Sequence, residues 1–462
     1  MQFVAGIFAL FSISGAVYGI SENLFVYPSP GDLSSVEHLA ICEKYSVSIK
    51  DKMGIDHPSF VYFTDNYGWE SNIFLNSDRI VDFPPRFECG ASFTNFSVSN
   101  DSVTIEIKCQ FDLRTVQIRP SSFCIKPTVI GNTISFTLSE PSKLFVEIND
   151  RKHPLFIFAN EPDVPNFDAD HYFGSGVHHI GAKYTIKSNE KVYIAGGAVV
   201  EGTLKLSGNN IEIRGRGILS GGQWTWNQWK KDTDLSLIKG SSSNSVVEGL
   251  CLVNSPGWVV AVSGNHRVVK NVKVIGWNGN TDGLWCSGDQ GLFADCFIFN
   301  NDDALYHSYG SHVEIRNNIV WNGPWGHTIL FAVGGDPKPA ENCLIENTYV
   351  IGIQTRGDQP VVTINENAVK KDIIFRNLYV ESCITSILIY FSPAETTFSN
   401  IVFENLEVDR PMNILLNGLN NGLINGVHFI NLVMGGEMIC SKADAPLYTI
   451  GNVKNVTIKC QD

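Results

Sequence analysis

The sequence predicts an all-β chain, in which an N-terminal β-sandwich is followed by a right-handed parallel β-helix, a solenoid of stacked coils. Three observations predict this class. Short strand-like segments broken by turns fill the first third of the chain, and a cassette that ends in a short apolar strand recurs through the second half. No helical periodicity accompanies that recurrence. Strand-based repeats of about 20–30 residues are typical of solenoids.

Residues 1–19 form an apolar run, MQFVAGIFALFSISGAVYG, that ends in small residues. Such a run predicts a secretory signal peptide with cleavage after Gly19. Because no basic residue precedes the run, a first buried strand is the alternative interpretation. No later apolar run is long enough to span a bilayer, so we expect a secreted, extracellular chain without membrane contact. Eleven cysteines and acceptors for N-glycosylation at Asn95, Asn100 and Asn455 are compatible with that compartment.

The pattern of short strand-like segments over residues 20–160 predicts the sandwich. The stretch SVTIEIKC at 102–109 alternates apolar and polar residues, as a half-buried antiparallel strand does. Further β-rich segments follow at the spacing of a sandwich. The Pro- and Asp-rich stretch NEPDVPNFDAD at 160–170 marks the passage to a second domain, 161–462.

The second domain contains nine cassettes of a polar residue, an asparagine or small residue and a short apolar strand. Their spacing is 22–30 residues, which favours a β-helix over a large antiparallel sandwich. We expect the recurrent asparagines to form side-chain ladders at the turns. The cassettes begin at Glu248, Lys270, Ala294, Arg316, Glu346, Arg376, Glu404, Ile430 and Lys454.

Three carboxylates follow two neighbouring cassettes. Asp282 lies in GNTDGLW, and Asp302 and Asp303 lie in NNDDALYH, 20 and 21 residues further on. One coil apart, they are expected to converge on one lateral patch. Hydrolysis of a glycosidic bond needs two carboxyl groups, and crowding raises the pKa of at least one of them. The alternative is that each Asp is only a turn former.

Aromatic residues surround these carboxylates, and rings of this kind stack on the apolar faces of sugars. Some of them are expected to belong to the core. The six aromatic residues are Trp277, Trp285, Tyr306, Tyr309, Trp321 and Trp325. Residues assigned to substrate contact are Trp285, Tyr306, Tyr309, Trp325 and His327.

The charge of the chain limits the kind of molecule that it can bind. The formal net charge is −13, which argues against a nucleic-acid partner. Between residues 274 and 337 there are seven acidic residues and one basic residue, Arg316. A groove built from this segment would repel a polyanion and favours a neutral glycan, bound by a monomer.

The segments NTDGLW, FADCFIFNNDDALYHSY and IRNNIVWN resemble glycoside hydrolase family 49, the dextranases and isopullulanases. The stretch YIAGGAVVEGTLKLSGNNIEIRGRGILSGGQW is similar to that family as well. The resemblance implies the same two-domain layout and an inverting hydrolysis of α-glucans, most often at α-1,6 linkages. It also implies that Asp302 is the general acid and that Asp282 and Asp303 activate or position the water.

A weaker resemblance connects the chain to family 28, the polygalacturonases, through NTDG, the paired Asp residues and His327. The second glycine of that family's GHG motif is Thr328 here, and the lysine of its RIK motif is Asp358, two residues after Arg356. Loss of the lysine argues against a uronate substrate. A pectin hydrolase and a non-catalytic glycan-binding β-helix remain alternatives.

No cofactor and no metal are expected, because an acid and a base suffice for this chemistry. The stretch HYFGSGVHHIG contains His171, His178 and His179. These histidines lack carboxylates at metal-binding spacing, and we interpret them as structural.

Overall fold

A computed structural model describes residues 20–21, 24–65, 90–99, 101–323, 325–332, 338–353, 359–383 and 385–461. The predicted signal peptide and Arg356 lie outside these ranges. The described chain is almost entirely strand, with one short helix, α1 (Trp226–Lys231), and the 3-10 turns η3 (Ser121–Phe123) and η4 (Thr233–Leu235). No helix among the described residues has the length and apolar character needed to cross a bilayer.

The first part is the predicted sandwich of two sheets. Strand β8 (Val103–Cys109) shows why the sandwich forms, because buried and more exposed residues alternate along this strand. Its buried side chains pack against those of the facing sheet. One sheet contains β1 (Ile20–Ser21), β2 (Leu24–Val26), β3 (Leu39–Ile41), β6 (Val61–Thr64), β7 (Ala91–Val98), β9 (Val116–Arg119), β12 (Ser142–Ile148) and β13 (Asp150–Asn160). The other contains β4 (Tyr45–Lys50), β5 (Asp56–Ser59), β8 (Val103–Cys109), β10 (Thr128–Ile130) and β11 (Thr133–Leu138).

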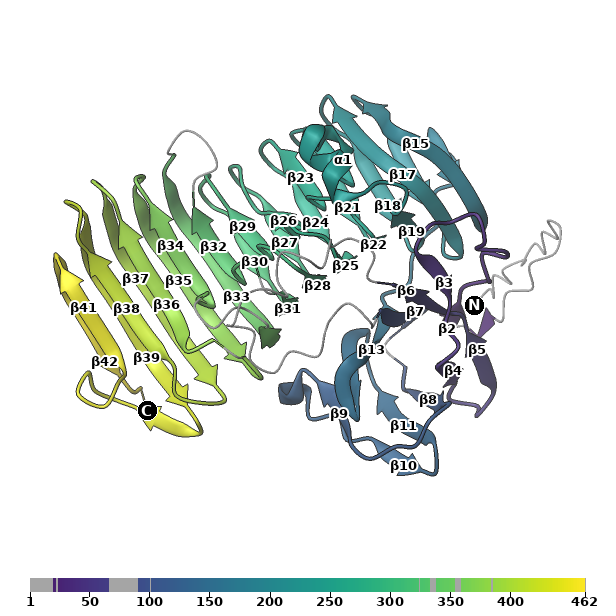
Figure 1. The fold of residues 1–462 in the computed structure, drawn as a ribbon, viewed down its shortest axis with the longest axis horizontal. Coiled ribbons are helices and arrows are strands. Elements are labelled where there is room, and N and C mark those ends of the chain that lie inside the picture. Colours follow the sequence, from purple (N-terminus) through teal and green to yellow (C-terminus); the bar gives the residue numbers. More distant parts are fainter. Residues whose placement is uncertain are drawn as a thin grey trace, which may run out of the picture.

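The second part is a parallel β-helix, which confirms the predicted fold class. Strands β14 to β42 form one continuous sheet that winds through successive coils. Equivalent strands of neighbouring coils pair in parallel and define three faces. Figure 1 shows the coils as one long stack, with the sandwich beside its N-terminal part and the yellow C-terminal coils extending beyond it.

The first face contains β14 (His171–Phe173), β16 (Lys191–Ile194), β18 (Glu212–Gly215), β21 (Val246–Glu248), β24 (Val268–Lys270), β27 (Leu292–Ala294), β30 (Glu314–Arg316) and β42 (Val453–Lys459). The second contains β19 (Ile218–Ser220), β22 (Cys251–Val253), β25 (Lys273–Ile275), β28 (Phe297–Asn300) and β31 (Ile319–Asn322). The third contains β20 (Ile238–Ser241), β23 (Val260–Ser263), β26 (Leu284–Trp285), β29 (Leu305–His307), β32 (Ile329–Ala332), β34 (Val362–Glu366), β36 (Ile387–Pro393), β38 (Asn413–Gly418) and β41 (Leu447–Gly451).

Longer strands bend across two faces. β15 (Gly176–Lys187) and β17 (Ala198–Ser207) cover the second and third faces, and β33 (Ala340–Ile353), β35 (Lys370–Val380), β37 (Thr397–Val408) and β39 (Leu423–Met434) cover the first and second. The short β40 (Glu437–Ile439) pairs antiparallel with β39. A disulfide joins Cys440 to Cys460 in the C-terminal coil.

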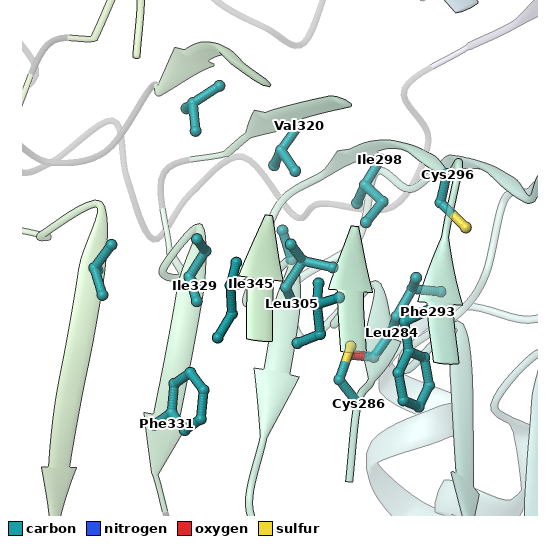
Figure 2. Close-up of a cluster of buried hydrophobic side chains, with 14 of the residues drawn as sticks. Leu284, Cys286, Phe293, Cys296, Ile298, Leu305, Val320, Ile329, Phe331 and Ile345 are labelled. Atoms are coloured by element: carbon teal, nitrogen blue, oxygen red, sulfur yellow. The ribbon is translucent and has the colours of Figure 1, made fainter. Parts of the chain in front are cut away.

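Aliphatic and aromatic side chains fill the solenoid interior. Leu284, Leu305 and Ile329 occupy equivalent positions of three successive coils and are fully buried. Figure 2 shows these residues pointing inward beside Cys286 and Phe331. Because residues alternate along a strand, the neighbour of each of these residues faces out of the solenoid. This alternation positions the groove described below.

Asparagine marks the corner between the first and second faces. Asn317, Asn347 and Asn377 all have φ between +50° and +55°, which asparagine tolerates better than most residues. Each amide donates to the side chain one coil earlier, at 2.8–2.9 Å. The predicted asparagine ladder is therefore confirmed.

The sandwich and the solenoid share an apolar interface. Phe156 of β13 lies 4.8 Å from Phe297 and 5.3 Å from Phe299, ring centre to ring centre. Trp277 and Trp321, two of the aromatics of the carboxylate-bearing coils, belong to this interface and are buried. They are core residues and cannot stack on a sugar. Asn95 is buried as well, and its amide donates to Arg216, so it is inaccessible as a glycosylation acceptor in the folded chain.

Candidate active site

The strand register brings two of the predicted acids into one row. Leu284 pairs with Leu305, and the N–H of Gly283 donates to the carbonyl of Asp303 at 2.8 Å. Two residues before the paired leucines, Asp282 and Asp303 therefore occupy equivalent positions on adjacent coils, about 4.8 Å apart along the solenoid. Both lie at the corner between the second and third faces, which we call the acid corner.

Asp302 lies one residue before this row, and its carboxylate is fixed by the backbone. One oxygen accepts the N–H of Asn280 at 3.0 Å, and the other accepts the N–H of Asp303 at 2.9 Å. Asn280 belongs to the loop of Asp282, so this contact joins the two acidic loops. The three predicted catalytic residues are thus brought together.

Buried amides support these loops from below. Asn300, at the end of β28, donates to the carbonyls of Thr281, Asp302 and Asp303 at 2.8–3.1 Å. Asn322, one coil later, also donates to the carbonyl of Asp302. Buried carbonyls need hydrogen-bond donors. Where the two loops leave the sheet, these side-chain amides replace the backbone donors that the sheet would supply.

A glycine on the next coil packs directly against the acid pair. A Cβ atom on Gly326 would lie 2.0 Å from the carbonyl carbon of Asp302 and 2.0 Å from the nitrogen of Asp303. Only a residue without a side chain permits this approach. The second glycine of the GPWGHT stretch, Gly326, therefore has a steric role at the site.

Asp303 faces a histidine of the next coil. One of its carboxylate oxygens accepts the N–H of His327 at 2.8 Å and lies 3.0 Å from its Nδ1. Both side chains remain partly exposed, at 22% for His327 and 17% for Asp303. His327 is thus a partner of Asp303, in the row that contains Asp282 and Asp303.

The pKa values of the other two carboxyls, Asp282 and Asp302, are raised, which favours their protonated forms. Burial raises the pKa of Asp282 well above its usual range, and the charges of Asp302 and Asp303 raise it further. The indole N–H of Trp285, nearby but outside hydrogen-bonding geometry, opposes this rise. Burial, and next the charge of Asp303, raise the pKa of Asp302 to about 6, against the two backbone N–H donors and His327. As a unit, the cluster retains a proton at mildly acidic pH.

A groove of about 580 Å³ opens on the third face beside Asp282 and Asp303, and Asp302 is not among its described lining residues. Five of the predicted residues line it: Asp282, Asp303, Trp285, Tyr306 and Tyr309. Trp285 and Tyr306 occupy equivalent positions on adjacent coils, with ring centres 6.0 Å apart. Aromatic side chains thus lie beside two of the acids, and their contact with a substrate stays a prediction. Trp325 and His327 border the acid loop and do not belong to the described lining.

Two further lining residues escaped the sequence interpretation. Trp258 stands two residues before a third-face strand, as Asp282 and Asp303 do, and its ring centre lies 4.7 Å from that of Trp285. Aligning the cassettes by their third-face strands would have found it. Lys338 is the one cation among the described lining residues, and its Nζ lies 4.5 Å from the ring centre of Tyr309. Lys338 was missed because the count of charged residues in the sequence ended at residue 337.

Within the described residues, no group of three His, Cys, Asp or Glu side chains is arranged to hold a metal ion. The histidines at the solenoid entrance are bound to carboxylate, hydroxyl and carbonyl partners. His171 lies 3.3 Å from Glu190, and His178 donates to the carbonyl of Gly174 at 2.7 Å. The expectation of a metal-free site remains a prediction.

Comparison with known proteins agrees with the predicted resemblance to dextranases. The chain is 28% identical over 214 residues to a dextranase of Arthrobacter globiformis and 28% identical over 208 residues to a dextranase of Arthrobacter sp. strain CB-8. Each match covers 39% of this chain and 32% of the dextranase, so the chain matches about a third of the length of these relatives. No family model matches the chain.

Solved structures with some likeness include a family 28 exopolygalacturonase of Yersinia enterocolitica, at 11% identity and a TM-score of 0.35. This match covers 78% of this chain and 96% of the other. The catalytic unit of a GH87 α-1,3-glucanase of Streptomyces thermodiastaticus matches at 10% identity and a TM-score of 0.38, over 95% of this chain and 85% of the other.

Proposed function

We propose that the chain is a secreted, monomeric glycoside hydrolase that cleaves a neutral α-glucan, such as dextran, with inversion at the anomeric carbon. The observation that carries the proposal is the meeting of three carboxyls at the acid corner, two of them with raised pKa values, beside an aromatic groove. Similarity to dextranases supports the choice of substrate class.

The roles are those that the resemblance to family 49 implies, and the environment of each carboxyl supports them. Asp302, with a pKa raised to about 6, is the general acid that gives its proton to the leaving glycosidic oxygen. Asp303, held by His327, accepts hydrogen bonds from the attacking water. Asp282, on the adjacent coil in the same row, positions that water from the other side. Inversion requires a water molecule between base and sugar.

The lining of the groove supports a neutral chain. Trp258, Trp285 and Tyr306 offer ring faces for sugar stacking. The carboxylate of Asp303 would repel a polyanion, and Lys338 is partly engaged with the ring of Tyr309. Electrostatics therefore disfavours polygalacturonate.

A product screen tests the proposal. The protein is incubated with dextran, pullulan, polygalacturonate and arabinan, and the anomer released first is identified by proton NMR. We expect the β-anomer from dextran. The α-anomer first would contradict inversion, release from polygalacturonate alone would contradict the substrate class, and binding without turnover would contradict catalysis.

The acid itself is tested with Asp302→Asn. We expect kcat to fall by about 10²–10⁴-fold, the usual contribution of a positioned general acid, with dextran affinity unchanged. Asp295→Asn is the matched control, because Asp295 lies at the opposite asparagine corner, bound to Asn317. Equal activity in the two variants would overturn the assignment.

A further inference from the structure

A second arrangement of reactive side chains lies outside the acid corner. The Oγ of Ser35, in the segment between β2 and β3, is 3.2 Å from Nε2 of His179 on β15. Nδ1 of the same histidine is 2.9 Å from the carboxylate of Glu201 on β17. The sandwich part supplies the hydroxyl, and the first two coils of the solenoid supply the histidine and the acid.

The acid of this group is buried and fully hydrogen-bonded. Glu201 has no exposed surface, and besides His179 it accepts the backbone N–H of Glu37 at 2.9 Å and the amide of Gln223 at 2.7 Å. The hydrogen-bond geometry fixes the roles of the imidazole nitrogens, because a carboxylate oxygen accepts. With Nδ1 of His179 donating to Glu201, Nε2 is free to accept the Ser35 proton.

The other two groups are accessible. Ser35 is exposed, and the His179 side chain is 43% exposed. A hydroxyl, an imidazole and a buried carboxylate, connected in this order through Nε2 and Nδ1, form the arrangement that activates a serine nucleophile. A purely structural histidine does not need an exposed hydroxyl on its second nitrogen.

We propose that Ser35, His179 and Glu201 form a second catalytic site, which removes acyl groups from esters. Ser35 Oγ attacks the carbonyl carbon of the ester and passes its proton to His179 Nε2. The bond between acyl carbon and alcohol oxygen then breaks, and His179 returns the proton to that oxygen. Water attacks the acyl-serine, His179 takes a proton from the water, and Ser35 Oγ leaves with this proton. The sum is ester plus water giving acid plus alcohol, with Glu201 as a positioning residue.

The place of this site points to an acylated sugar as its substrate. On successive coils, Glu201 pairs with Ser220, Ser220 with Val253, and Val253 with Ile275. Ile275 ends the strand that precedes Asp282, so three coil steps separate Glu201 from that strand. The two sites therefore lie along the same corner, about 14 Å apart in axial distance. One segment reaches both sites, because Gln223 contacts Glu201 and the Trp226 indole lies 3.2 Å from the Asn280 side chain. The choice of an acylated sugar rests on the proposed glycosidase function, whereas ester hydrolysis at Ser35 does not.

Serine reactivity provides the test. The full chain is treated with a biotinylated fluorophosphonate, the labelled peptide is identified by mass spectrometry, and hydrolysis of p-nitrophenyl acetate is followed in parallel. We expect the label on Ser35 and an at least tenfold loss of hydrolysis in Ser35→Ala. Ser34→Ala is the matched control, since Ser34 is an exposed neighbour that bonds Asp32 instead.

Further variants separate catalysis from a structural contact. Glu201→Gln should lower kcat for the acetate ester and leave KM unchanged, and Asp302→Asn should leave ester hydrolysis at the wild-type rate. If Ser35→Ala hydrolyses the ester as fast as the wild type and Ser35 takes up no label, the proposal is wrong and the contact only holds the two parts of the chain together.

Discussion

At the scale of single residues, the site separates neighbouring carboxyls by their environment. Asp302 and Asp303 share a peptide bond, yet Asp302 meets only backbone donors and Asp303 meets the side chain of a histidine. Asp282 is buried, and the indole of Trp285 and a backbone N–H oppose the rise of its pKa. The convergence of the three acids could be predicted from the sequence, because it depends only on the length of one coil. The differences between them depend on Asn280 and His327, whose contacts are made through loop conformation.

The pKa of Asp282 predicts a stability difference. Its folded pKa is raised above the unfolded value, so its favourable contribution to stability is present below about pH 3.9 and is lost as the pH rises through the folded pKa. Asp282→Asn should therefore be about 1–3 kcal/mol more stable than the wild type at pH 8 and nearly equal at pH 4. Chemical denaturation at both pH values measures this.

Asp303→Asn is the contrasting variant. It loses its charge-assisted contact with His327, and we expect it to be less stable at pH 6 by about 1–2 kcal/mol. Two isosteric changes one coil apart would then have opposite signs. Equal signs would mean that the contact with His327 does not stabilise Asp303.

Gly326 gives a steric prediction. Gly326→Ala places a methyl group 2.0 Å from the Asp302–Asp303 peptide, so we expect about 1–3 kcal/mol lower stability and loss of most hydrolytic activity. Gly174→Ala is the control, because its nearest new contact is an ordinary 3.5 Å. Thermal unfolding and dextran hydrolysis of both variants provide the comparison, and an active Gly326→Ala would show that the acid pair can move.

At the scale of elements, the corner asparagines set the shape of each coil. Asn377 joins the two halves of β35 with φ +54°, donates to Asn347 and accepts from Asn405 at 2.8–2.9 Å. The recurrence of asparagine made this ladder predictable from sequence. The groove lining was only partly predictable, because the coil of Trp258 has no aspartate at the acid corner. Asn300, which supports the acidic loops from inside the solenoid, was not predicted.

Two substitutions of Asn377 distinguish the contribution of its positive φ from that of its side-chain hydrogen bonds. Asn377→Ala loses both the ladder contacts and the tolerance of positive φ, and we expect it to lower the free energy of unfolding by about 2–4 kcal/mol. Asn377→Gly keeps the backbone tolerance and should lose about 1–2 kcal/mol. Urea denaturation measures both, and equal losses would mean that φ contributes nothing at this position.

At the scale of the whole molecule, the sandwich and the solenoid meet through aromatic side chains directly beneath the acid corner. Phe299 and Trp321 lie in β28 and β31, whose last residues, Asn300 and Asn322, hold the carbonyl of Asp302. Phe156 of the sandwich packs against Phe299. The sequence predicted both parts but not this contact, because nothing in an alternating strand tells which of its two faces meets a second domain.

This contact predicts that a change in the sandwich reaches the active site. Phe156→Ala removes a buried ring and should lower stability by about 3–5 kcal/mol, and relaxation of Phe299 and Asn300 should lower kcat on dextran at least several-fold. Phe403→Ala is the matched control, because Phe403 is also fully buried but lies in the C-terminal stack with Phe375 and Phe429. It should lose comparable stability and keep its kcat at a temperature where both variants are folded. Equal kcat values would mean that the sandwich stabilises the solenoid without shaping the acid corner.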